Sequence, residues 1–197
     1  MEKQLTPQES LAIISTMIEK TKHSISDKSH YFLLWGYAVF IGCTLQFTLK
    51  KLEYEKHYLA WLVTVAAIIL HIAFSIRDSK REKVSTYASD ANAYLWMGIG
   101  FSFMVLAFIF SYMEQGWRYC FPFYILFYGL GTFVSGGMLR YKPLMIGGGI
   151  CYVLAVVAVF IDYDMQILLT AISIFISYII PGHMLRMEYR KQKQVVS

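Results

Sequence analysis

In a chain as apolar as this one, chemistry is expected at polar side chains that fall within long apolar stretches. The candidates are Gln46 and His71, which lie inside such stretches, and His183, which ends one. A histidine in this setting can ligate a metal or a haem, or it can hydrogen-bond to a neighbouring helix. The sequence places no carboxylate beside His71 to orient its imidazole, and no two histidines are four residues apart. We therefore interpret the three residues as a polar intramembrane site, with hydrogen bonding between helices as its expected role.

Three arginines, Arg77, Arg140 and Arg186, each end a long apolar stretch. Arginine in this position anchors a span at the cytoplasmic headgroups. If the three span ends converged on one axis, the guanidinium groups could also bind a lipid phosphate together. Both interpretations make membrane lipids the expected contact of these side chains.

Patterns that would indicate catalysis or a cofactor do not occur. The three cysteines, Cys43, Cys120 and Cys151, have no C-x-x-C spacing, and two of them fall within apolar stretches, where thiols pack as small hydrophobic groups. There is no G-x-S-x-G motif, and no Asp, Glu, Lys or Arg stands in the middle of an apolar stretch. We therefore expect no enzymatic activity, no cofactor and no metal site.

These residues are positioned by six long apolar stretches. Of the 197 residues, 57% are hydrophobic and 16% are charged, whereas soluble domains carry about 25% charged residues. Helices rise about 1.5 Å per residue, so stretches of this length cross a hydrocarbon layer about 30 Å thick. Backbone groups in lipid must bond within their own segment, so the expected fold is all-α. The expected transmembrane domain covers 30–185, with spans at about 31–49, 58–76, 93–113, 119–139, 143–161 and 165–183.

The distribution of basic residues predicts the orientation. Fourteen of the 18 Lys and Arg residues fall in segments on the side of the N-terminus, including a basic tail at 186–197, and four fall in the opposite loops. By the positive-inside rule, both ends are expected in the cytoplasm. No basic stripe with interleaved aromatic residues lies outside the spans, so nucleic acid is not an expected partner.

The segment 1–29 has the pattern of an amphipathic cytoplasmic helix. Thr6, Pro7 and Glu9 have the spacing of a capping box with proline at the first helical position. An apolar stripe follows at helical spacing, formed by Leu11, Ile14, Ile18 and Ile25. Two interpretations remain open: the helix rests on lipid headgroups, or residues 7–28 dock a cytoplasmic protein partner.

Short outer loops force neighbouring spans to pack antiparallel, which predicts three consecutive hairpins. A G-x-M-L-R pattern ends both the fourth span, at 136–140, and the sixth, at 182–186, as expected if the hairpins repeat one unit. Small residues four apart predict close helix contacts; the pairs are Gly98 with Ser102, Gly131 with Ser135, and Gly147 with Cys151. The glycine run 147–149 predicts that the fifth span is central.

Three strings carry a resemblance to a known family: YFLLWG at 31–36, FYGLGTFVSG at 127–136 and SYIIPGHMLR at 177–186. They are similar to a family of small six-span bacterial inner-membrane proteins with no assigned activity. The resemblance covers nearly the whole chain, including the TPQES opening at 6–10. It implies a bacterial cytoplasmic-membrane protein and brings no functional residues with it.

The leading functional hypothesis is a non-enzymatic membrane protein that acts as an interaction or regulatory module, with a homo-oligomer among its possible forms. The alternative is a small transporter or permeation unit for an uncharged or lipid-like substrate. A continuous cavity lined by Gln46, His71 and Cys151 would favour transport. Metal-ligand proximity of His71 and His183 would favour an enzyme.

Overall fold

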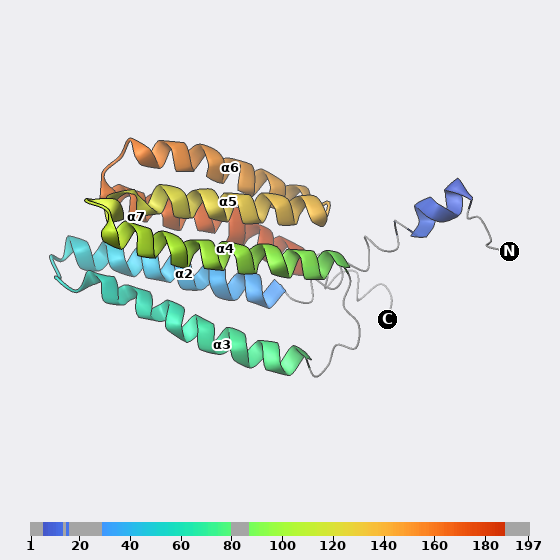
Figure 1. The fold of residues 1–197 in the computed structure, drawn as a ribbon, viewed down its shortest axis with the longest axis horizontal. Helices are drawn as coiled ribbons and strands as arrows, with labels where there is room; N and C mark the ends of the chain where they lie inside the picture. The colour runs from blue at the N-terminus through green and yellow to red at the C-terminus, as the bar shows by residue number, and fades with distance from the viewer. Residues whose placement is uncertain (1–5, 14, 16–28, 80–86, 188–197) are drawn as a thin grey trace.

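The computed structural model describes residues 6–13, 15, 29–79 and 87–187, and over these residues all regular structure is helical. The long helices are α2 (Ser29–Lys51), α3 (Leu62–Ser79), α4 (Tyr87–Tyr112), α5 (Cys120–Met138), α6 (Lys142–Val159) and α7 (Tyr163–Ile174), as Figure 1 shows. Short 3₁₀ turns precede α3 (His57–Trp61) and α5 (Gly116–Tyr119). A π-helical turn (Phe175–Ile179) continues α7, and the helix then runs to residue 187.

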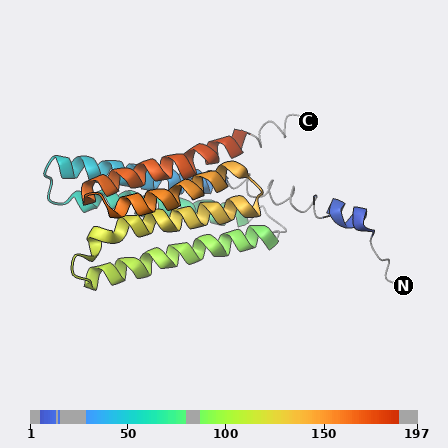
Figure 2. The same cartoon turned by 90° about the horizontal axis from the view of Figure 1, so that it is seen from above.

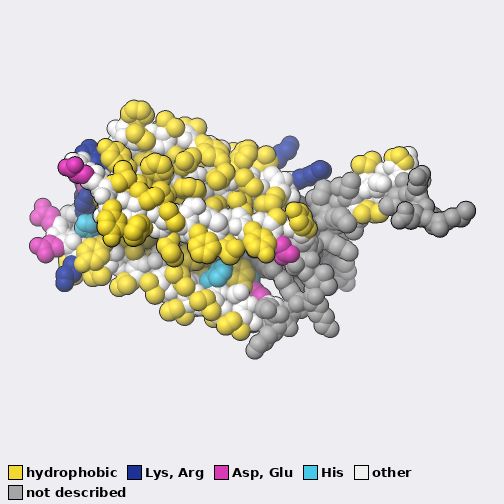
Figure 3. Space-filling model, viewed as in Figure 1, with side chains coloured by type: hydrophobic (Ala, Val, Ile, Leu, Met, Phe, Trp, Pro, Cys, Tyr) yellow, Lys and Arg dark blue, Asp and Glu magenta, His cyan; other side chains and the backbone are white. Residues whose placement is uncertain are grey.

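Six helical segments are long and apolar enough to cross a membrane, which confirms the six predicted spans. They are His30–Lys51, His57–Asp78, Ser89–Tyr112, Gly116–Met138, Lys142–Val159 and Tyr163–Met187. Apolar side chains cover the visible flank of the bundle, while charged side chains gather at its two ends (Figure 3). This surface is the reverse of a soluble domain, whose flanks carry charge. The fold is that of a membrane protein.

The third span begins four residues earlier than the sequence pattern suggested. Its first turns contain Ser89 and Asn92, which the sequence pattern placed in the preceding loop. Both residues are buried. The Ser135 hydroxyl on α5 donates a hydrogen bond to Asn92 Oδ1 at 2.6 Å. Because this contact satisfies the polar group inside the bundle, the helix can start before its apolar stretch.

Three helices form the centre of the bundle, and three lie at its periphery. Helices α2, α5 and α7 bury the largest share of their residues, whereas α3 packs mainly on α2, and α4 packs mainly on α5 (Figures 1 and 2). The prediction that the fifth span is central was wrong. Helix α6 lies at one edge of the bundle in Figure 1, with Ile146, Val153 and Val156 largely exposed.

The glycine run in α6 explains why this edge helix is nonetheless closely packed. A Cβ on Gly147 would lie 2.8 Å from Ser177 Cα on the α7 side, and one on Gly148 would lie 2.5 Å from Phe133 N on the α5 side. A Cβ on Gly149 would meet nothing within 4 Å. Three consecutive residues on a helix point in three directions, so two glycines serve two neighbours and the third faces outward.

Two of the three small-residue pairs mark close helix contacts, as predicted. A Cβ on Gly131 would lie 2.7 Å from the Trp96 ring of α4, and Trp96 Nε1 donates to Ser135 Oγ at 3.1 Å. Gly147 and Cys151 both lie against α7, where the Cys151 thiol is 3.9 Å from the Ser173 carbonyl oxygen. Gly98 has no atom within 4 Å of a Cβ position, so its pair makes no such contact within the described chain.

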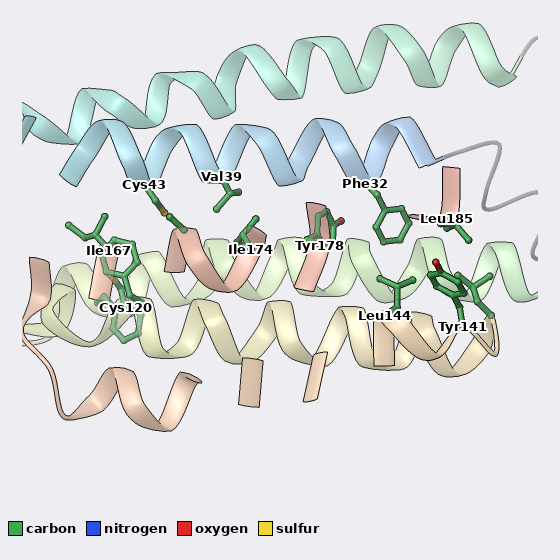
Figure 4. Packing of buried hydrophobic residues seen from close by; sticks show 14 residues of the cluster. Phe32, Val39, Cys43, Cys120, Tyr141, Leu144, Ile167, Ile174, Tyr178 and Leu185 are labelled. Atoms are coloured by element: carbon green, nitrogen blue, oxygen red, sulfur yellow. The ribbon is translucent and has the colours of Figure 1, made fainter. Parts of the chain in front are cut away.

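The centre of the bundle is filled by side chains from α2, α5 and α7. In Figure 4, Phe32, Val39 and Cys43 extend from α2 toward Ile174 and Tyr178, and all five belong to one buried cluster. Cys43 and Ile174 are fully buried. Apolar groups gain little by leaving lipid for a protein core, so the closeness of this packing, rather than hydrophobicity, stabilises the helix contacts.

The capping box predicted at the N-terminus is present. Thr6 N donates to Glu9 Oε2 at 2.8 Å, and Glu9 N donates to Thr6 Oγ1 at 3.2 Å. The Thr6 backbone N–H and hydroxyl both donate to the Glu9 carboxylate and lower the pKa of this carboxyl, so the charged form that caps the helix persists to more acidic pH. Helix begins at residue 7. The rest of the predicted helix, 14 and 16–28, lies outside the described residues, as does most of the basic tail.

The adjacent glycines of α6 provide a matched pair for mutation. Gly148→Ala should lower the free energy of unfolding by about 1–3 kcal/mol, because its methyl group meets α5 backbone and forces the helices apart. Gly149→Ala should leave stability unchanged or raise it by up to about 1 kcal/mol, since alanine favours helix. Unfolding in mixed micelles, followed by circular dichroism, measures both. Equal losses in the two variants would contradict the assigned packing.

Candidate functional site

The polar residues expected to do chemistry lie mainly where α2 packs on the second span. Gln46 lies at the end of this interface next to the 3₁₀ turn His57–Trp61. Its side chain is buried, and its Oε1 accepts a hydrogen bond from Trp61 Nε1 at 2.8 Å. Gln46 Nε2 lies 3.4 Å from His57 Nδ1. Gly42, one turn before Gln46 on α2, faces the Trp61 ring, and a Cβ there would be in ordinary contact with it at 3.4 Å. Both ends of the Gln46 amide therefore hold α2 to the segment that begins the second span.

His71 lies farther along the same interface, opposite the first half of α2. Trp35 Nε1 on α2 donates to His71 Nδ1 at 3.2 Å, and the Tyr31 ring centroid lies 4.8 Å from the imidazole centroid. A nitrogen that accepts a hydrogen bond carries no proton, so the ring is neutral with its proton on Nε2. His71 thus makes the interhelical hydrogen bond expected for it.

A polar cluster that the sequence analysis missed lies just beyond His71, at the ends of α2 and α3. The Asp78 carboxylate accepts from Tyr31 Oη at 2.9 Å, lies 3.2 Å from His30 Nε2, and lies 3.4 Å from Arg77 Nε. The antiparallel pairing of the two helices brings Tyr31 opposite Asp78 and Trp35 opposite His71. These pairs could have been predicted from the sequence. A short loop between two antiparallel helices fixes which residues face each other farther along the hairpin.

His183 lies apart from the other candidates, on α7. Its Nε2 is 2.7 Å from Tyr37 Oη of α2. The structure therefore does not bring Gln46, His71 and His183 into one site, since each pairs with a different partner in a different place. Within the described ranges, no group of three or more His, Cys, Asp or Glu side chains could hold a metal ion.

Arg77 and Arg140 lie at opposite edges of the same end of the bundle, and Arg186 lies in the last described turn of the final helix. Arg77 ends α3, contacts Asp78 and lies over the Phe74 ring at 5.2 Å. Arg140 lies in the turn between α5 and α6, with φ of 50°. In Figure 1, α3 forms one edge of the bundle and α6 forms the opposite edge. This arrangement suits separate headgroup anchors and does not support one shared phosphate site.

A second polar feature that sequence reasoning missed runs along the buried face of the last helix. Its members are Gln166, Thr170, Ser173 and Ser177, each 2% exposed or less. The three hydroxyls donate to the carbonyl four residues earlier, at 2.6 to 2.8 Å. Their spacing of four, three and four residues is one face of a helix, which was a usable signal. Gln166 Nε2 donates to the Ile161 carbonyl at 3.2 Å, while its buried Oε1 accepts no hydrogen bond from the described residues.

Charged residues at the outer end join the first membrane helix to the last. Lys50 Nζ lies 2.5 Å from Asp164 Oδ1, and Lys51 Nζ lies 3.4 Å from Asp164 Oδ2. Lys50 Nζ is also 4.4 Å from the centroid of the Tyr163 ring. These opposite charges tie the start of α7 to the end of α2.

Some of these polar side chains link two helices, and others bond to the backbone of their own helix. Most intramembrane polar groups described above are hydrogen-bonded within the bundle, as expected where water is absent. Gln46, His71 and Cys151 contact three different sets of neighbours, so they do not line one continuous path. This arrangement favours a structural role for the bundle over a reaction carried out inside it.

The hydrogen bonds of Gln46 can be tested by an apolar replacement of similar size. Gln46→Leu should lower the free energy of unfolding by about 1–2 kcal/mol, because Trp61 Nε1 loses its acceptor in an apolar setting. The control is Leu45→Ala, since Leu45 is 43% exposed on the neighbouring face. Unfolding in mixed micelles gives both values. A Gln46→Leu protein as stable as the parent would show that the bond contributes nothing.

Comparison of the chain with protein-family models, with curated proteins and with solved structures finds no match. The function is therefore proposed from the residues, their geometry and the resemblance of the three strings at 31–36, 127–136 and 177–186. The structure itself shows the architecture. The described residues form an all-α protein with six helices long and apolar enough to cross a membrane.

Proposed function

We propose that this chain is a non-enzymatic multi-pass protein of a bacterial cytoplasmic membrane that acts as an interaction or regulatory module. In this proposal the six spans form three antiparallel hairpins, and both ends of the chain lie in the cytoplasm. The excess of Lys and Arg in the segments on the N-terminal side supports that orientation. The resemblance to six-span bacterial inner-membrane proteins supports the choice of membrane.

The observation that carries the proposal is the contrast between the bundle and the N-terminal segment. Within the bundle, most buried polar side chains are hydrogen-bonded, either to another helix or to the backbone of their own helix. At the N-terminus, a capped helical turn presents Leu11, 65% exposed, and Ile13, 41% exposed. Exposed apolar side chains on a stable turn form the kind of surface that binds a partner helix or groove. We therefore assign binding of a cytoplasmic protein to residues 7–28.

The transport alternative receives less support. It requires a path along which Gln46, His71 and Cys151 face the same space. Gln46 bonds to Trp61, His71 bonds to Trp35, and Cys151 lies against α7. Opening a path along all three would break contacts at two helix interfaces, that of α2 with the second span and that of α6 with the last helix.

Orientation can be tested by thiol labelling, because the three native cysteines are buried. Glu114→Cys places a thiol in the loop between α4 and α5, and Lys142→Cys places one at the start of α6; both positions are exposed. A membrane-impermeant maleimide should label Glu114→Cys in intact cells. It should label Lys142→Cys only after the cells are permeabilised. The reverse pattern would place the N-terminus outside, and labelling of both variants in intact cells would contradict a spanning bundle.

Partner binding can be tested by in-cell crosslinking of the full chain with Leu11 and Ile13 both changed to Gln. Removing two apolar side chains should lower the affinity for a protein partner, and so the yield of its crosslink, by about tenfold or more. Burial of one such side chain contributes about 1.5–3 kcal/mol to binding. Gln8→Ala is the control, because Gln8 is exposed on the same turn. An unchanged set of protein crosslinks would exclude docking through this segment. Crosslinks to lipid alone would assign the segment to the headgroups instead.

A further inference from the structure

The last membrane helix is interrupted at one point in its inner half. Residues Phe175–Ile179 form a π-helical turn between two α-helical segments, and Pro181 follows two residues later. Proline has no N–H, and its ring excludes a regular hydrogen bond to the carbonyl four residues earlier, which belongs to Ser177. A π turn inserts one extra residue and widens the helix. The π turn therefore lets the helix pass Pro181 without ending.

Both neighbouring helices make room for the widened turn. A Cβ on Gly36 of α2 would lie 2.9 Å from Tyr178 Cδ1 and 3.1 Å from Ile179 Cγ1. A Cβ on Gly147 of α6 would lie 2.8 Å from Ser177 Cα. Residues of the π turn thus face glycines on two sides. The turn is built into the packing of the bundle.

Beyond the turn, the segment 180–187 is attached to α2 by two neighbouring residues. Gly182 lies against Leu33, whose Cδ2 would be 3.1 Å from a Cβ there. His183 Nε2 is 2.7 Å from Tyr37 Oη, and this polar pair lies on the exposed side of the helices. This hydrogen bond lies at the edge of the helix pair, whereas Ser177 and Tyr178 are buried inside the bundle.

We propose that the last membrane helix is a two-part device in which the π turn is a hinge. The inner segment 180–187 moves against α2, and the Tyr37–His183 hydrogen bond holds it in the closed position seen here. Pro181 keeps the turn from becoming regular α-helix and leaves the Ser177 carbonyl without the backbone N–H four residues later, so the segment after the turn can bend there. Such a bend removes His183 from Tyr37.

The hinge is connected to the rest of the bundle through Tyr178. Its ring centroid lies 5.1 Å from that of Phe32 on α2 and 5.4 Å from that of Trp96 on α4. Trp96 in turn fills the notch at Gly131 of α5. A bend at the turn would displace Tyr178 and so alter the contacts among four helices. The inner end of the last helix is thereby coupled to the bundle core.

Amide hydrogen exchange of the full chain in lipid nanodiscs tests this proposal. Tyr37→Phe removes the hydroxyl and keeps the ring, so exchange in 180–187 should rise about threefold to tenfold, the effect of losing a hydrogen bond of about 1 kcal/mol. Exchange in the outer part of α7 (Tyr163–Ile174) should not change. Tyr94→Phe is the control, because Tyr94 is 69% exposed on α4.

Pro181→Ala provides the second arm, since it restores the missing N–H and permits a continuous α-helix. It should slow exchange around 178–182 and abolish the effect of Tyr37→Phe in the double variant. The proposal is overturned if Tyr37→Phe leaves exchange in 180–187 unchanged, or raises it equally in all six helices. It is also overturned if Pro181→Ala leaves exchange around the turn unchanged or faster.

Discussion

The close approach of α6 to both α5 and α7 is the contact on which the rest of the bundle depends. In lipid, apolar side chains gain little by leaving their surroundings, so helices associate through tight packing and hydrogen bonds. Gly148 lets α6 meet the backbone of α5, and Gly147 lets it meet the π turn of α7. These contacts set the spacing of the three helices. The position of α7 then sets where α2 can pack, through Gly36.

A second constraint is the need to pair polar groups where water is absent. It explains why Gln46, His71 and Asn92 each bond to a neighbouring helix. Side chains held in this way fix the register of antiparallel helices, because a shift of one residue would separate each donor from its acceptor. The polar interior thus helps to fix how the helices pack against one another.

Much of the architecture could be predicted from the sequence, but the interior could not. Six apolar stretches and the capping box at Thr6 were confirmed, because each depends on residues close together in the chain. The polar start of α4 was missed, since Asn92 is buried only through Ser135, 43 residues away. The central place predicted for the fifth span was wrong, because a glycine run shows that neighbours come close and not how many neighbours surround the helix.

The sequence by itself determined that the chain is helical and suited to a membrane, because bilayer thickness and backbone hydrogen bonding leave few choices for a long apolar stretch. It also determined which end of each helix carries basic charge. Only the tertiary structure decided which polar residues meet. In the structure, Gln46, His71 and His183 lie in different places, and Asp78 accepts a hydrogen bond from Tyr31. The π turn after α7 packs against Gly36 and Gly147. Such meetings depend on the rotation and register of helices far apart in the chain, which no local pattern specifies.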